Sequence, residues 1–121
     1  MQFPKQPLFV EHSKIPVWLS KLAPIEIGAI TLGFIVFSRE EMSEITKRHE
    51  TIHYQQFVET LFIGFLLIYA FDYLVNRIVH KMDGQEAYFN LRAEKEAYKH
   101  DTDESYLANR TRYAWLFENK N

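Results

Sequence analysis

The sequence predicts a mainly helical α+β fold, in which a small β-strand or hairpin precedes about four helices. One observation is the segment 25–37, which is rich in β-branched and aromatic residues. A second is the helical spacing of apolar residues from about residue 39 onward. Because 121 residues with 47% apolar content suffice for one packed core, we expect an extended N-terminal segment over 1–24 and a single domain over 25–121.

The β element should lie between the prolines and the first helix. All four prolines, at positions 4, 7, 16 and 24, fall in the segment 1–24, which is why we expect it to be largely extended. The stretch IEIGAITLGFIVF (25–37) predicts a strand, bent or paired as a hairpin near Gly28 and Gly33. Ser38 with Glu41 then has the S-x-x-E spacing of a capping box, which predicts a helix over about 39–59.

Three further helices complete the predicted fold. Gly64 marks a joint, after which an apolar helix should span about 63–80 and end before the Asp83-Gly84 turn. A third helix is predicted over about 86–100. A fourth, over about 103–118, has acidic residues in its first turn.

Composition and charge exclude several classes of function. The net charge of -2, with basic residues scattered among acids, gives no basis for nucleic-acid binding. The absence of cysteine excludes disulfides, a thiolate nucleophile and a cysteine-ligated zinc site. The N-terminus does not resemble a secretory signal. The unbroken apolar run 61–71 is shorter than a bilayer span of about 20 residues, so we expect it in the core of a cytoplasmic protein, with membrane association not favoured.

Residues 47–57, KRHETIHYQQF, contain an H-E-x-x-H frame made by His49, Glu50 and His53. At 100° per residue, both imidazoles lie on the apolar stripe of the predicted helix, and Glu50 lies just beside it. Two histidines one turn apart can bind one metal ion, and the carboxylate between them can take a proton from bound water. The alternative is a pair of hydrogen-bonded core histidines, since the frame also arises by chance. We favour the metal site.

A third ligand is expected, because catalytic zinc takes three protein ligands and leaves one position open. In LRAEKEAYKH (91–100), Glu94 would share a helix face with Leu91 and Tyr98, whereas Glu96 would point away toward solvent. We therefore predict Glu94 as the third ligand and a solvent-exposed ion pair with a neighbouring Lys or Arg for Glu96. An ion pair is also the alternative for Glu94, and the rival third ligands are His80 and His100.

The order of these features resembles the minigluzincin-type metallopeptidases, small single-domain relatives of the gluzincin clan. HETIHYQQ, the apolar helix after it and EAYFNLRAEKEAY carry the resemblance, which covers about residues 25–118. It implies a zinc ion (Zn2+) held by His49, His53 and Glu94, with Glu50 as general base and acid in the hydrolysis of a peptide or protein substrate. It also implies that substrate adds as an antiparallel strand along IEIGAITLGFIVF.

The same resemblance implies latency, with the terminal segment RYAWLFENKN lying in the cleft through Tyr113, Trp115 or Phe117. The alternative for these aromatic residues is a place in the core. The chain departs from related enzymes in two ways. The separation of His53 from Glu94 is longer than in thermolysin-like enzymes, and Tyr98 stands where several related membrane peptidases have an aspartate. The oxyanion stabiliser stays open among Tyr88, Tyr98, Tyr113 and His100.

Two other functions are compatible with the sequence. A non-catalytic protein could use zinc to join helices of a small domain. A metal-free helical module could use LFIGFLLIYAFDYLV (61–75) to dock on a membrane or a partner helix. Glu50 distinguishes a non-catalytic zinc protein from an enzyme, because a purely structural site has no use for a carboxylate beside an open metal position.

Overall fold

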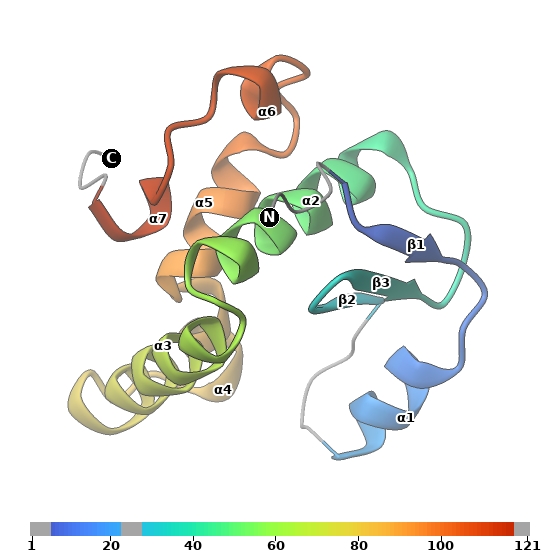
Figure 1. Cartoon of the computed structure of the whole chain (residues 1–121). Coiled ribbons are helices and arrows are strands. Elements are labelled where there is room, and N and C mark those ends of the chain that lie inside the picture. The colour runs from blue at the N-terminus through green and yellow to red at the C-terminus, as the bar shows by residue number, and fades with distance from the viewer. Residues whose placement is uncertain (1–5, 23–27, 118–121) are drawn as a thin grey trace.

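A computed structural model describes residues 6–22 and 28–117, and it confirms the predicted mainly helical α+β fold. A small sheet and one short helix lie on one side of the molecule, and most of the other helices lie on the opposite side. The long helix α2 (Glu44–Glu59) runs between these two parts (Figure 1). It contacts strand β2 in one part and helices α3 and α5 in the other. Both histidines of the H-E-x-x-H frame are therefore on the element that joins the two parts.

The sheet contains three strands in the order β1-β3-β2. β1 (Leu8–Val10) pairs parallel to β3 (Ile35–Ser38), and β2 (Ala29–Leu32) pairs antiparallel to it. β2 and β3 form the predicted hairpin. Gly33 has φ of 68° at the first position of the two-residue turn, where glycine is favoured. Residues 25–27 of the predicted strand segment lie outside the described residues.

The extended conformation expected for residues 1–24 is wrong for residues 15–22, which form helix α1 (Ile15–Leu22). Pro16 lies in the first turn of this helix, where a missing backbone N–H costs nothing. The Ser13 hydroxyl accepts a hydrogen bond from the Ile15 N–H (3.1 Å) and helps to begin the helix. The prolines therefore delimit α1 instead of preventing it.

Helix α2 begins later than the predicted capping box implied. Its N-cap is Ser43, whose hydroxyl accepts a hydrogen bond from the Thr46 N–H at 3.1 Å. Ser38 is instead the last residue of β3, and its hydroxyl interacts with the backbone of Glu40. Residues 39–42 connect the end of β3 to the start of α2.

The turn after α2 is sharp and is made by two apolar residues. Leu61 and Phe62 have φ of 56° and 65°, in the left-handed region that non-glycine residues rarely adopt. The helical segments on either side, Glu44–Glu59 and Ile63–Val79, are bent by 110° relative to each other. Gly64 follows the turn, and a Cβ at this position would come within 2.9 Å of the Thr60 Cβ. The predicted joint is therefore next to Gly64, which must stay small.

The apolar segment forms helix α3 (Ile63–Leu74), which continues as the π-helix η1 (Val75–Val79). The prediction that it would be buried is wrong. Phe65 is the one fully buried residue of α3, whereas most of its large apolar side chains are exposed. Within the described residues, neither this helix nor any other single one is long and apolar enough to cross a membrane. The bent pair of α2 and α3–η1 together has the length and composition that a broken span would need.

The two last predicted helices are each divided. The third forms α4 (Gly84–Phe89) and α5 (Arg92–His100), separated at Leu91, which adopts an extended conformation and is fully buried. Asp83 caps α4 in a capping box with Glu86. The fourth forms two short helices, α6 (Tyr106–Asn109) and α7 (Ala114–Phe117). Arg110 leaves the helical path between them because its side chain reaches α2 and α5.

The hydrophobic core joins α2, α3, α5 and α7. Phe57, Phe65, Ala93 and Trp115 form its buried cluster. The Phe57 and Phe65 rings are stacked with their centroids 4.0 Å apart, and Trp115 lies against Phe65 at 5.5 Å. This cluster fixes α5 against α2, and therefore places Glu94 opposite the two histidines.

Candidate metal centre

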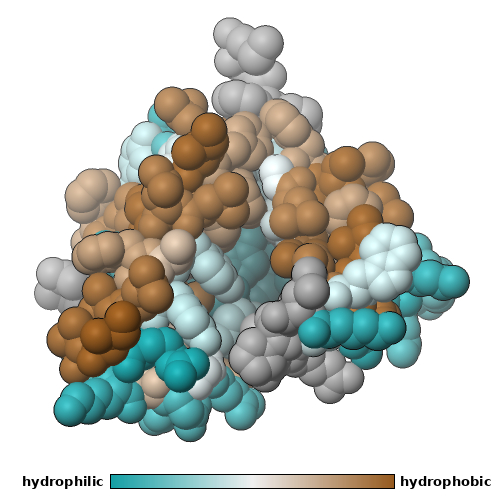
Figure 2. Space-filling model, turned by 90° about the horizontal axis from the view of Figure 1, so that it is seen from below, coloured by the Kyte–Doolittle hydropathy of each residue, from teal (hydrophilic) through white to brown (hydrophobic). Residues whose placement is uncertain are grey.

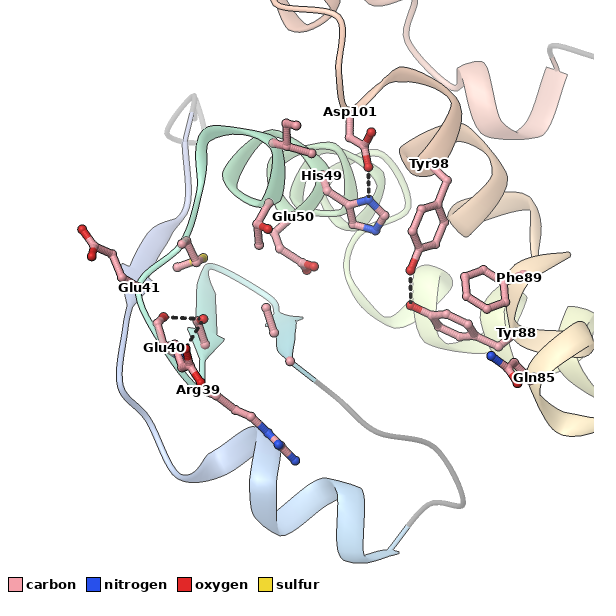
Figure 3. Close-up of a pocket in the computed structure, with 16 residues that line it drawn as sticks. Arg39, Glu40, Glu41, His49, Glu50, Gln85, Tyr88, Phe89, Tyr98 and Asp101 are labelled. Carbon is pink, nitrogen blue, oxygen red and sulfur yellow. Dashed lines mark hydrogen bonds and ion pairs between the residues drawn. The ribbon is translucent and has the colours of Figure 1, made fainter.

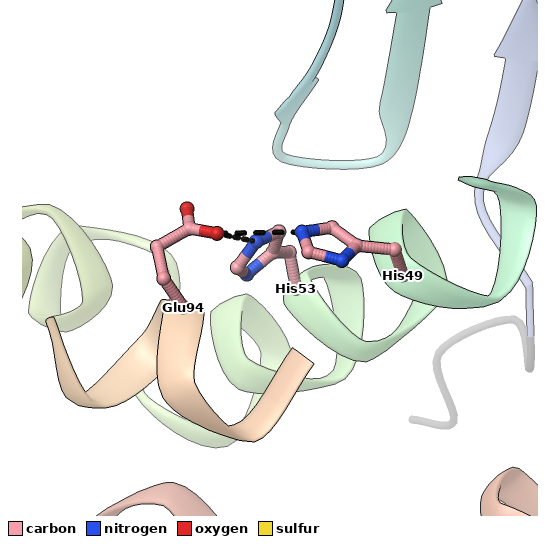
Figure 4. Close-up of side chains that lie close together, drawn as sticks. All are labelled: His49, His53 and Glu94. Atoms are coloured by element: carbon pink, nitrogen blue, oxygen red, sulfur yellow. Dashed lines mark hydrogen bonds and ion pairs between the residues drawn. The ribbon is translucent and has the colours of Figure 1, made fainter. Parts of the chain in front are cut away.

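His49, His53 and Glu94 form a buried group that can hold a metal ion (Figure 4). The two histidines come from successive turns of α2, and Glu94 comes from the first turn of α5. One ligand atom from each residue lies within 4.8 Å of the other two. All three side chains are almost fully buried, with exposed fractions of 7%, 5% and 3%. The helical spacing predicted for the histidines thus produces convergence on one point.

The distances in this group fit a tetrahedral ion. Glu94 Oε1 is 3.3 Å from His49 Nε2 and 3.1 Å from His53 Nε2. Ligand atoms at about 2.0–2.2 Å from zinc, arranged tetrahedrally, would be roughly 3.3–3.6 Å apart. Two imidazoles with one carboxylate are also a donor set that zinc uses in catalytic sites. The group therefore needs little movement to hold a zinc ion.

Each histidine is oriented by a hydrogen bond at the nitrogen that faces away from the group. His49 Nδ1 donates to Asp101 Oδ2 at 3.0 Å, and His53 Nδ1 donates to Gln56 Oε1 at 2.8 Å. Gln56 is itself held, since its amide donates to the Ala93 carbonyl. Both Nε2 atoms are thus left for a ligand, which is the arrangement that supports metal-binding histidines.

Glu94 is oriented in the same way. The Tyr69 hydroxyl, from α3, donates to Glu94 Oε2 at 2.9 Å, so that Oε1 faces the histidines. Burial, together with the Glu94 carboxylate, raises the pKa of Tyr69 well above its ordinary value. Tyr69 therefore stays protonated and remains a donor. Sequence analysis did not identify Tyr69, Gln56 or Asp101, although Asp101 lies two turns after Glu94 on the same helix face, a spacing that could have revealed it.

The charges of the group are strongly coupled. Burial alone would lower the pKa of His53, but the adjacent Glu94 carboxylate outweighs it and raises this pKa to about 9. Burial alone would raise the pKa of Glu94, but His53 and His49 hold it well below its usual range. In the absence of an ion, the contact between His53 Nε2 and Glu94 needs a proton on that nitrogen. A metal ion would take the place of this proton.

Glu50 lies beside the group and is held by the sheet. Its side chain is 7% exposed, and its Oε1 accepts a hydrogen bond from the Thr31 hydroxyl of β2 at 2.8 Å. The same hydroxyl lies 3.2 Å from the Glu50 backbone carbonyl. Figure 3 shows the Glu50 side chain directed into a cavity. The buried carboxylate is therefore positioned by a second element as well as by α2.

The cavity, of about 800 Å³, lies between the sheet and the helices α4 and α5. His49 and Glu50 form part of its wall (Figure 3), and Gly28 and Ala29 also line it. A ligand in the cavity would therefore reach one side of the metal group and Glu50 together. The volume falls within the range of small-ligand clefts.

Tyr88 and Tyr98 line the wall opposite the sheet, and their hydroxyls are 3.4 Å apart (Figure 3). The Tyr98 ring also lies edge-on against His49, with centroids 4.4 Å apart. Tyr98 thus occupies the space beside His49, and Asp101, one turn later, supplies the carboxylate that orients this histidine. The other two oxyanion candidates lie elsewhere: Tyr113 lines a separate smaller pocket, and His100 stacks on Tyr106.

The rival third ligands are not in the metal group. His80 is exposed and His100 is stacked on Tyr106, and neither belongs to the His49, His53 and Glu94 group in the described part of the chain. The described part of the terminal segment does not line the cavity either. Trp115 is in the core and Phe117 is exposed, whereas residues 118–121 lie outside the described residues.

The prediction for Glu96 is wrong. Glu96 is 5% exposed and forms a buried ion pair with Arg110, which also pairs with Glu59 of α2. Burial alone would raise the pKa of Glu96, but the hydrogen bond and charge of Arg110 lower it below its ordinary value. Glu96 Oε1 also accepts from the Gln56 amide at 2.9 Å. The ion pair therefore supports the residue that orients His53.

No protein-family model, curated protein or solved structure matches the chain. The fold and the site together define a mainly helical α+β protein with a buried His-His-Glu group that can hold a metal ion.

Proposed function

We propose that this chain is a zinc-dependent peptidase of the minigluzincin type, with zinc held by His49, His53 and Glu94. The observation that carries the proposal is the orientation of all three side chains. Each has a hydrogen-bond partner on the atom that faces away from the group: Asp101, Gln56 and Tyr69. Hydrogen-bonded core histidines would also have partners, but here the atoms left over, both Nε2 and Glu94 Oε1, converge on one point, as the oriented ligands of a metal ion do.

Glu50 supports a catalytic site over a purely structural one. When bound, a zinc ion supplies Lewis acidity and lowers the pKa of water at its open position. The Glu50 carboxylate, which lines the cavity together with His49, would accept the proton of this water and deliver it to the leaving amine. Thr31 holds Oε1 through this transfer. A structural site would gain nothing from a carboxylate placed in this way.

The sheet and the tyrosines suit a peptide substrate. β2 pairs with β3 on one side, and Gly28 and Ala29, at the start of β2, line the cavity. A peptide could add there as an antiparallel strand, with its reacting carbonyl near Glu50. The Tyr88 and Tyr98 hydroxyls face it from the opposite wall and supply hydrogen-bond donors for the developing oxyanion.

Metal content and peptide hydrolysis test the proposal in turn. Wild-type protein purified without chelators should contain about one zinc ion per chain, the stoichiometry of a three-ligand site, and Glu94→Ala should lose most of it. Glu50→Gln should retain the zinc but lose hydrolysis of a peptide library. A wild-type chain that is folded and takes up no zinc contradicts the site. Hydrolysis that survives Glu50→Gln contradicts the catalytic role and leaves a zinc-stabilised protein.

A further inference from the structure

Helix α3 and η1 carry a long stripe of exposed apolar side chains. The exposed fractions of its members lie between 55% and 75%. The stripe comprises Leu61, Ile63, Leu66, Leu67, Phe71, Leu74, Ile78 and Val79. Six of them, from Ile63 to Ile78, have the spacing of one helix face, whereas Leu61 lies in the turn before α3 and Val79 is the last residue of η1. A contiguous apolar surface of this kind on a small protein marks an interaction site.

The opposite face of the same helix is fixed to the rest of the protein. Phe65 is in the core, and the Tyr69 hydroxyl bonds Glu94. Further along, Asp72 accepts two hydrogen bonds from Arg92, both at 2.9 Å, and the Asn76 amide donates to the Ala87 carbonyl. Because these contacts hold the helix in its orientation, it cannot rotate to bury the stripe.

Exposed apolar side chains also lie on α1 and on the sheet. Trp18 of α1 is 59% exposed, and Leu8 and Leu32 of the sheet are 62% and 43% exposed. Figure 2 shows two separate hydrophobic areas on the face seen from below, one on the side of α3 and one on the side of α1 and the sheet. The hollow between them is paler and more polar. The two hydrophobic areas therefore lie on either side of one hollow on the same face.

Exposed cations lie in both areas, and the exposed acids Asp83 and Glu86 follow at the start of α4. Residues 12–21 contain no acid, and Lys14 and Lys21 of this segment are exposed. Residues 61–82 contain one acid, Asp72, which is neutralised by Arg92, whereas Arg77 and Lys81 are exposed. Cations beside an apolar face complement anionic lipid headgroups.

We propose that this face docks on the surface of a membrane that contains anionic phospholipid. The α3–η1 stripe and the residues around Trp18 would lie among the headgroups and upper acyl chains, where exposed tryptophan is favoured. Docking lies in the plane of the interface, because no single described helix is long enough to span and the inner face of α3 is bound to the protein. The proposal is independent of bound metal and of catalysis.

Sedimentation with vesicles tests the docking. Full-length protein should pellet with phosphatidylcholine–phosphatidylserine vesicles, less with phosphatidylcholine alone, and less as salt is added. Leu67→Glu with Phe71→Glu should lower the partition coefficient at least tenfold. Arg77→Gln and Lys81→Gln should lower it about fivefold each, the factor that corresponds to about 1 kcal/mol per cation. The matched control is Ala108→Glu with Thr111→Glu, which adds the same charge at and just after α6, away from α3 in Figure 1. This control should bind vesicles as well as the wild type does.

Tryptophan fluorescence gives a second measurement that does not depend on the charged variants. The chain has two tryptophans: Trp18 is exposed, and Trp115 is 4% exposed in the core. In Trp115→Phe, the emission of Trp18 should shift to shorter wavelength when anionic vesicles are added. Circular dichroism of every variant without lipid establishes that each is folded.

Three outcomes overturn the proposal. One is folded wild-type protein that stays in the supernatant with unshifted Trp18 emission, and another is equal vesicle binding by the α3 double variant. The third is that wild-type protein does not bind vesicles but self-associates in a concentration-dependent way, and that the α3 double variant abolishes this self-association. That result would assign the face to a second copy of the chain. Glu94→Ala should bind vesicles like wild type, so failure of docking and failure of the zinc site give different results.

Discussion

The hydroxyl of Thr31 in β2 donates a hydrogen bond of 2.8 Å to Glu50 Oε1 in α2. This contact joins the edge strand of the sheet to the carboxylate of the H-E-x-x-H frame. In the proposed enzyme, the strand that receives the substrate thus also fixes the general base. Substrate position and the direction of the proton transfer would be set by one element.

Thr31→Val should lower kcat/KM without removing the metal. Valine keeps the shape of the side chain but leaves Glu50 Oε1 without its donor, and a hydrogen bond to a charged group contributes about 1.5–3 kcal/mol. We expect a loss of about tenfold or more in peptide hydrolysis, with unchanged zinc content. Thr31→Ser is the matched control and should retain most of the activity. Equal activity of the valine and serine variants would show that Thr31 does not position Glu50.

Asp101→Ala should weaken zinc binding. Asp101 accepts the hydrogen bond from His49 Nδ1, and loss of such a partner typically costs 10- to 100-fold in metal affinity. Competition with a chromogenic chelator measures the dissociation constant. Asp103→Ala removes an exposed acid two residues away and should leave the affinity unchanged. An Asp101→Ala affinity equal to that of wild type would mean that His49 is oriented by packing against Tyr98 alone.

The metal group was predictable from the sequence because local helix geometry determines most of it. The spacing of His49 and His53 fixes their relative position on any helix, and Glu94 shares a face with Leu91, which the structure buries completely. The hairpin was predictable for the same reason, since Gly33 permits the turn between two β-branched segments. The spacing of the histidines and the hairpin turn depend on contacts close in the chain, whereas the approach of Glu94 to His53 depends on the packing of α5 against α2.

Glu96 and α3 show where the sequence was insufficient. The burial of Glu96 depends on Arg110, which comes from a segment predicted to continue as a helix. The exposure of α3 depends on how much of its apolar surface the other elements cover. Phe65 stacks against Phe57, whereas Leu66 and Leu67, the next residues in the chain, remain exposed. Composition alone does not distinguish a buried apolar helix from an exposed one.

Zinc should stabilise the protein more as the pH rises from about 6.5 toward 9. The pKa of His53 is raised from 6.5 in the unfolded chain to about 9 in the folded, metal-free chain. The stability contributed by the His53–Glu94 pair is therefore fully present below about pH 6.5 and is lost as the pH rises through about 9. Zinc takes the place of the proton, so the zinc-loaded chain does not lose this contribution.

Denaturant unfolding of metal-free and zinc-loaded protein at several pH values in this range measures the effect. The difference in unfolding free energy between the two forms should widen with pH. Glu94→Gln removes the charge that raises the pKa of His53, so its metal-free form should lose this part of the pH dependence. A difference that stays constant from pH 6.5 to 9 would rule out displacement of the His53 proton.

Arg110→Met should be the most destabilising change outside the metal group. The Arg110 side chain is 3% exposed and donates to Glu96 and Glu59 at 3.0 Å and 3.1 Å. Removing one partner of a buried ion pair costs about 3–5 kcal/mol, because the remaining charges stay buried and unpaired. Chemical denaturation measures this loss, and Arg112→Met, at an exposed position, should change stability little. If Glu96→Gln partly restores the stability of Arg110→Met, the cost comes from the unpaired carboxylate; if it restores nothing, the cost comes from lost packing.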